Sequence, residues 1–190
     1  MNNNYAEVIS SMEESSFYSK NESNLIDKWD LYYHLSTNND WSLSSYKLIM
    51  GGIDSVEKVV SLNTNISENI VKTTMLFVMK SGIKPLWEDP RNKNGGGFSF
   101  KVINKYVPQV WKELFYALCG GTLSVDKKHY SLINGITISP KRNFCIIKIW
   151  FYLIKRTIVD INRSFHLIQI IIMWIHYLNT PTKTPGFSNI

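Results

Sequence analysis

The sequence has few of the residues that build a metal site or a disulfide framework. Of its 190 residues only two are cysteine, Cys119 and Cys145, and its four histidines form no pair with metal-ligand spacing. Both cysteines stand among apolar neighbours, which indicates buried free thiols in a reducing compartment. We therefore expect no metal and no cofactor.

Long apolar runs are lacking as well. The two longest, residues 144–154 and 167–178, are shorter than the roughly 18–20 residues that a helix needs to cross a bilayer. Charged residues divide them, so we expect buried strands and no membrane partner. The chain does not start with a basic segment and an apolar run, which predicts that a secretory signal is absent.

No catalytic pattern is evident. The sequence has no Ser/His/Asp set at a recognisable spacing, no metal cluster and no glycine loop that would cradle a phosphate before a helix. These absences indicate a binding protein rather than an enzyme.

Acidic residues are scarce near the C-terminus. Residues 141–190 carry seven Lys or Arg and one acidic residue, whereas residues 1–50 carry three Lys and seven acidic residues. A basic segment indicates an anionic partner such as a phosphate, a nucleic acid or a lipid headgroup. A solvated surface has the same composition, so charge alone does not choose between the two.

The apolar content of 44% suffices for one domain. Residues 1–22 are expected to form a disordered tail, 23–180 the domain and 181–190 a C-terminal tail. Alternation and apolar, β-inclined runs predict strands at residues 24–35, 41–49, 73–79, 98–102, 129–139, 144–153 and 170–178. Helical periodicity predicts helices at 54–63, 107–119 and 159–169, the first capped by Asp54 with Glu57 in a capping box. This order predicts an α+β fold in which an antiparallel sheet carries helices on one face.

The six tryptophans divide into two groups. Most tryptophans of a small domain lie in its core, and Trp111 and Trp174 stand in apolar segments that fit this role. Trp41 and Trp87 instead stand at the edges of polar loops. Exposed aromatic residues near basic residues commonly grip a single base by stacking on its faces.

The loop around Trp87 carries a resemblance. Residues 81–100, SGIKPLWEDPRNKNGGGFSF, are similar to the signature loop of the translation initiation factor 4E family, with G-I-x-P-x-W-E-D, then N-K-x-G-G, then a strand. The segments DKWDLYYHL, NNDWSL, IDSVEKVVSL, VWKELFYALCGG and INGITISPKRNFCIIKIW also resemble family elements. The similarity is good over about residues 24–150 and weaker over 151–190. It implies a curved antiparallel sheet with about three helices packed on its convex face.

The resemblance implies binding of the 7-methylguanosine cap of mRNA. Methylation at N7 makes the base a cation, which is attracted to the negative faces of two indoles. Trp41 and Trp87 are the implied stacking residues, Glu88 the acceptor at the base edge, and Trp150 the contact for the methyl group. A solvated loop acid is the alternative for Glu88, and a core position is the alternative for Trp150.

The implied phosphate contacts depart from the family. Lys141 stands where the family has a phosphate-binding Arg, and Ile146 occupies the second basic position. Arg142 is a second candidate for the phosphate, although strand alternation points it to the other face. Gly97 stands where an Arg is frequent. Lys148 is either a further cation on this path or a plain surface charge.

The implied protein-binding surface also departs from the family, which binds scaffold and repressor proteins carrying a Y-x-x-x-x-L-Φ helix on its convex side. The matching residues are Val56, Val60, Lys112, Glu113 and Tyr116. Val60 replaces a Trp, Lys112 an apolar residue and Tyr116 a Leu. Loss of an indole removes the best anchor type, so we expect altered partner specificity.

Taken with the residues, the resemblance implies a cytoplasmic protein that binds capped mRNA in translation initiation. One alternative is a repressor or decoy that captures caps without recruiting the scaffold protein. Another is a scaffold-like protein that has lost cap affinity.

Overall fold

The computed structural model of the protein describes residues 23–152. They form one antiparallel sheet of six strands in the order β2-β1-β3-β5-β6-β4. The strands are β1 (Asn24–His34), β2 (Lys47–Ser55), β3 (Met75–Lys80), β4 (Gly96–Ile103), β5 (Ile133–Pro140) and β6 (Phe144–Phe151). The helices are α2 (Val56–Asn65), α3 (Glu68–Thr73), α4 (Pro90–Lys93), α5 (Val107–Cys119), α6 (Lys127–Tyr130) and the 3-10 turn η1 (Leu43–Ser45).

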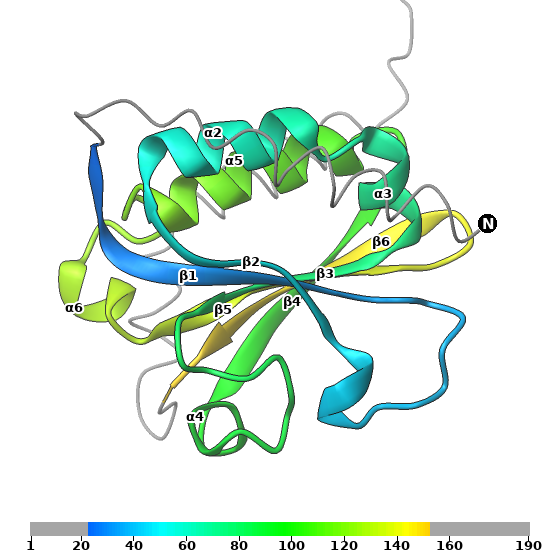
Figure 1. Ribbon diagram of the computed structural model, residues 1–190, viewed down its shortest axis with the longest axis horizontal. Coiled ribbons are helices and arrows are strands. Elements are labelled where there is room, and N and C mark those ends of the chain that lie inside the picture. The colour runs from blue at the N-terminus through cyan, green and yellow to red at the C-terminus, as the bar shows by residue number, and fades with distance from the viewer. Residues whose placement is uncertain (1–22, 153–190) are drawn as a thin grey trace, which may run out of the picture.

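Helices α2, α3 and α5 lie over one face of the sheet, and α4 lies on the other side (Figure 1). The expected α+β fold, a single domain with a curved antiparallel sheet and helices on its convex face, is confirmed. We call the two sides of the sheet the helical face and the open face.

Strand β6 shows how the sequence makes these two faces. Cys145, Ile147 and Ile149 are fully buried in the main core with the helices. Lys148 and Trp150 alternate with them and therefore belong to the open face, where Trp150 joins a second, smaller cluster.

Helix α5 is the clearest of the predicted helices and is confirmed. Pro108 lies in its first turn, where the missing N–H is no loss. The chain leaves the helix through Gly121, whose φ of 72° favours glycine. The residues that face the core are at most 1% exposed: Trp111, Leu114, Phe115 and Leu118.

The predicted cap of α2 is wrong. Ser55 is the N-cap, and its hydroxyl accepts a hydrogen bond from the backbone N–H of Lys58 at 3.4 Å. Asp54 belongs to β2 and forms a salt bridge with Lys58 at 2.7 Å. The Glu57 carboxylate accepts from the backbone N–H of Ser23 instead of closing a capping box. The helix thus starts one residue later than predicted.

Other boundaries also differ from the predictions. Residues 41–46 form a loop with η1, so β2 begins at Lys47, and residues 127–130 form α6 ahead of β5. Helices α3 and α4 were not predicted, because each is short and starts from a local side-chain cap, at Ser67 and Asp89. Four predicted segments lie outside the described residues: the tails 1–22 and 181–190, the helix 159–169 and the strand 170–178.

Both cysteines are free and buried, as expected. Burial raises the pKa of the Cys145 thiol to about 11 and that of Cys119 further, so both are protonated at neutral pH. Within residues 23–152 no helix is long and apolar enough to cross a membrane. The same residues contain no group of three or more His, Cys, Asp or Glu side chains that could hold a metal ion.

Candidate functional site

Two loops define the candidate site. The first loop, residues 35–46, joins β1 to β2, and the second loop, residues 81–95, joins β3 to β4. Both extend on the side of the sheet away from α2 and α5, and α4 marks the second loop in Figure 1. The two loops carry Trp41, Trp87 and Glu88, which the sequence had singled out.

Trp41 is supported from below by a histidine. The indole is 55% exposed and stacks on His34, the last residue of β1, with ring centroids 4.5 Å apart and planes 8° from parallel. His34 is fully buried, and its Nε2 donates a hydrogen bond to the backbone carbonyl of Asp40 at 2.8 Å. The imidazole thus covers one face of the Trp41 indole. The opposite face is available for stacking on a ligand.

The acid before Trp41 orders the first loop. The Asp40 carboxylate accepts hydrogen bonds from the backbone N–H of Ser42 at 2.8 Å and from its hydroxyl at 2.9 Å. These bonds hold the pKa of Asp40 below its ordinary value. The loop conformation around Trp41 is therefore set by local hydrogen bonds. These bonds compete with strand pairing, and β2 consequently starts later than the alternation predicted.

The second loop is held by Asp89 and Asn92. Asp89 accepts from the backbone N–H groups of Lys84 and Arg91, each at 2.9 Å, and so begins α4. Asn92 is fully buried and donates to the carbonyls of Lys84 at 3.0 Å and Leu86 at 2.8 Å. Both residues therefore fix the segment that ends at Trp87.

A second asparagine connects this loop to the sheet. Asn134 of β5 donates to Asn92 Oδ1 at 3.1 Å and to the carbonyl of Arg91 at 3.0 Å. Sequence analysis missed this pair because the two residues are 42 positions apart. A polar residue in an otherwise apolar strand was the available signal.

Trp87 and Trp150 lie close together. Trp87 is 52% exposed, and its ring centroid is 6.1 Å from that of Trp150, with the planes tilted by 47°. Trp150 is 8% exposed, and its Nε1 donates to Thr137 Oγ1 at 3.2 Å. Its strand partners on the two sides are Gly97 and Gly135. The buried ring of Trp150 thus forms a wall beside the half-exposed ring of Trp87.

The two loops meet over an aromatic floor. Tyr46 of the first loop packs on Phe77 of β3, with centroids 5.2 Å apart, and on His34, 4.9 Å away. Burial and then the charge of Glu88 raise the pKa of Tyr46, so the two loops interact electrostatically. Glu88 itself is exposed. The site therefore joins two exposed indoles, an acceptor and an apolar floor.

The candidate phosphate-binding cations lie at two separate places. Lys148 lies on the open face, with its Nζ 4.5 Å from the ring centroid of Trp150. Lys141 and Arg142 are exposed in the turn between β5 and β6, where the N–H of Lys141 donates to the carbonyl of Phe144 at 2.7 Å. That turn is roughly 20 Å from Trp150 along β6, since a strand rises about 3.3 Å per residue.

The residues expected to bind a protein partner gather on the helical side. Val56 and Val60 lie one turn apart on α2 and are 44% and 46% exposed. On α5, Lys112 and Glu113 are exposed, and the Lys112 Nζ lies 5.8 Å from the ring centroid of Tyr116. The neighbouring helices α2 and α5 therefore present this set together.

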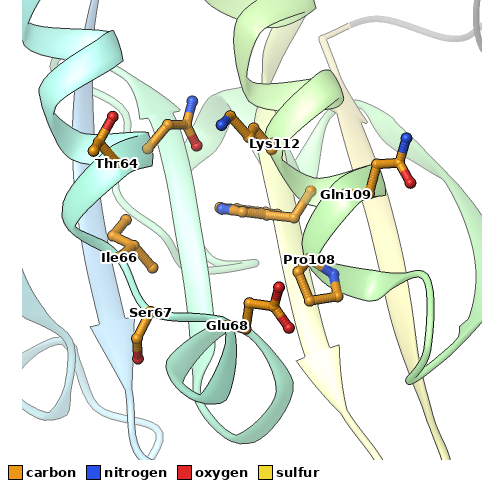
Figure 2. Close-up of a pocket in the computed structure, with 9 residues that line it drawn as sticks. Thr64, Ile66, Ser67, Glu68, Pro108, Gln109 and Lys112 are labelled. Atoms are coloured by element: carbon orange, nitrogen blue, oxygen red, sulfur yellow. The ribbon is translucent and has the colours of Figure 1, made fainter.

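A pocket of about 530 Å³ adjoins Lys112, between the ends of α2, α3 and α5. Figure 2 shows Ile66, Glu68, Pro108 and Lys112 around it. Trp111 also lines it, and its buried Nε1 has no hydrogen-bond partner within the described part of the chain. The pocket extends the helical surface beyond the residues that the sequence had indicated.

Comparison with known sequences gives consistent matches. A sequence model described as "Eukaryotic initiation factor 4E" matches residues 24–181. A "Eukaryotic translation initiation factor 4E homolog" of Acanthamoeba polyphaga mimivirus is 38% identical over 87 residues, which are 46% of this chain and 29% of that protein. The "Eukaryotic translation initiation factor 4E" of Eremothecium gossypii is 27% identical over 133 residues, 66% of this chain and 61% of that protein. The chain thus matches less than two thirds of the length of either relative.

Solved structures share the fold. The complex of C. elegans eIF4E-3 with the 4E-binding protein Mextli and a cap analog has a TM-score of 0.66 and 23% identity, covering 86% of this chain and 89% of that chain. The signature loop, the six-stranded sheet and the sequence match coincide over the same residues, and the chain therefore belongs to the eukaryotic initiation factor 4E family.

Proposed function

We propose that the chain binds the 7-methylguanosine cap of mRNA by stacking the methylated base between Trp41 and Trp87. The observation that carries this proposal is the pair of half-exposed indoles on two loops that meet over one aromatic floor. A desolvated cation–π contact contributes about 2 kcal/mol or more. Ordinary stacking contributes roughly 1–3 kcal/mol per base.

Glu88 reads the edge of the base in this proposal. The N1–H and N2–H groups of methylguanine point the same way, so one carboxylate can accept both. The charge on the base makes both better donors, and hydrogen bonds with an ionised partner are the stronger kind. The backbone N–H of Trp87 donates to O6. The exposure of Glu88 and its proximity to Tyr46 support this assignment.

Trp150 contacts the N7-methyl group, and the cations of the β5–β6 turn contact the distal end of the ligand. The position of Trp150 beside Trp87 supports the first assignment. Lys141 and Arg142 lie far along β6, which supports contacts with outer phosphates or the following RNA rather than with the base. A Lys is a point charge without the two-pronged geometry of Arg, so we expect a weaker grip on phosphate than an Arg gives.

The biological role proposed is translation initiation in the cytoplasm, without catalysis. The relatives are named as translation initiation factors. A specific observation favours a second role, that of a repressor or decoy that holds caps without recruiting a scaffold protein. Val60 offers a small apolar surface, and Lys112 places a charge beside it. Whether the chain supports or inhibits translation of a capped reporter distinguishes the roles.

Retention on immobilised 7-methyl-GTP tests the cap-binding proposal. Trp41→Ala, Trp87→Ala and Glu88→Gln should each lower affinity at least about tenfold, the equivalent of roughly 1.4 kcal/mol. Glu113→Gln, which changes an exposed acid on the helical side, is the matched control and should be retained like the wild type. Retention of all four variants at equal strength would contradict the proposed site.

A further inference from the structure

Lys148 is a cation beside the proposed base site, and its role was left open above. It lies on the open face of β6, with Ser99 of β4 and Thr137 of β5 as its strand partners. Its ammonium lies 4.5 Å from the centroid of Trp150, and Trp150 in turn adjoins Trp87. Lys148 therefore stands at the border of the aromatic floor.

A glycine on the neighbouring strand β4, Gly97, leaves space for the side chain of Lys148. A Cβ at Gly97 would lie 3.0 Å from Lys148 Cδ and 3.1 Å from its Cγ, closer than side chains normally approach. The stem of Lys148 thus occupies the space that a side chain at position 97 would need. This packing restricts the stem and directs the ammonium toward Trp150.

The ammonium has no carboxylate partner. Within residues 23–152 every salt bridge joins other side chains, and the charge of Lys148 rests on an indole face instead. A hydrogen bond to a phosphate oxygen, in which both partners are charged, is stronger than a partly exposed cation–π contact. The ammonium can therefore leave the ring for an arriving anion.

We propose that Lys148 binds the first phosphate of the cap, the one attached directly to the methylated nucleoside. This inference rests on the proposed stacking of the base between Trp41 and Trp87. Lys141 and Arg142 lie too far along β6 to share that phosphate, as they are roughly 20 Å from Trp150. The ligand is accordingly recognised mainly as a base plus its first phosphate, and the outer phosphates add little.

Three ligands titrated into the full chain separate the contributions: 7-methylguanosine, its 5′-monophosphate and its 5′-triphosphate, followed by Trp fluorescence. Lys148→Met keeps the packing of the stem and removes only the charge, and Lys148→Ala provides a second variant. We expect Lys148→Met to lower the affinity for the monophosphate about tenfold or more and to change the affinity for the nucleoside less than about twofold. Lys128→Met, which changes an exposed lysine of α6, is the matched control and should leave binding of all three ligands unchanged. Lys141→Met should weaken binding of the triphosphate only.

The outcomes are distinct. Equal weakening of nucleoside and monophosphate by Lys148→Met would show that Lys148 only supports Trp150, and would overturn the assignment. The assignment would also be overturned if Lys148→Met bound the monophosphate as tightly as the wild type. A loss of monophosphate affinity in Lys141→Met would overturn it as well. A wild-type chain that binds the nucleoside as tightly as the monophosphate refutes this inference alone. A wild-type chain that binds none of the three ligands refutes the cap-binding proposal and this inference with it.

Discussion

Replacement of Asn92 should loosen the loop that carries Trp87. The buried Asn92 side chain donates two hydrogen bonds, to the carbonyls of Lys84 and Leu86, and accepts one from Asn134. A net hydrogen bond contributes about 0.5–1.5 kcal/mol, and a buried group left unpaired costs about 1–3 kcal/mol. We therefore expect Asn92→Ala to lower the free energy of unfolding by about 2–4 kcal/mol, partly offset where water reaches the carbonyls.

Two measurements follow this change. The urea midpoint should fall by about 1 M or more, since urea lowers stability by about 1–3 kcal/mol per M. Affinity for 7-methyl-GTP should fall about tenfold, because the loop must then be ordered on binding. Asn94→Ala, an exposed asparagine in the same loop, is the control and should match the wild type in both assays. Equal midpoints and equal affinities for Asn92→Ala and Asn94→Ala would refute the role of this network.

Three further predictions concern charge and the helical surface. Hydrogen bonding to Lys58 lowers the pKa of Asp54, so its contribution to stability is present above the ordinary carboxyl pKa and is lost as pH falls through the depressed value. Asp54→Asn should therefore lower the urea midpoint at neutral pH, and the difference should vanish once the pH falls below that depressed pKa. Log affinity for 7-methyl-GTP should fall with log salt with a slope of only about −1 to −2, and Lys141→Ala should make it shallower; a steep slope unchanged by Lys141→Ala would contradict this. Val60→Trp should strengthen binding of a Y-x-x-x-x-L-Φ peptide by tens-fold, since about 100 Å² of added contact at about 25 cal/mol per Å² amounts to roughly 2–3 kcal/mol. Lys112→Leu should add to the gain. Nanomolar binding of this peptide by the wild type in calorimetry would show that the surface needs no indole.

The exposed tryptophans were predictable because their signal is local. Trp87 and Glu88 stand in one short signature, and Trp41 follows a polar turn. What lies beneath them was not predictable in the same way. His34 is seven positions before Trp41, but only the turn held by Asp40 brings the imidazole under the indole. Contacts of this kind depend on the path of the chain rather than on residue type.

The boundaries of the elements failed for a related reason. The alternation over residues 41–49 predicts a strand, but hydrogen bonds within the segment, from Ser42 to Asp40, compete with strand pairing and delay β2 to Lys47. The cations show the limit of alignment alone. Alignment selected Lys141, whereas alternation along β6 puts Lys148 on the face of Trp150, and only the structure shows its ammonium 4.5 Å from the Trp150 ring centroid.

The relative affinity of the wild-type chain for 7-methyl-GTP and GTP tests the central claim most directly. Only the methylated base carries the positive charge that two indole faces attract, and the two ligands have the same phosphates. Titration followed by intrinsic Trp fluorescence should give quenching and a preference for 7-methyl-GTP of at least about tenfold, roughly 1.4 kcal/mol. Equal affinity for the two nucleotides would contradict the account, because it would show that Trp41 and Trp87 do not stack on a cationic base.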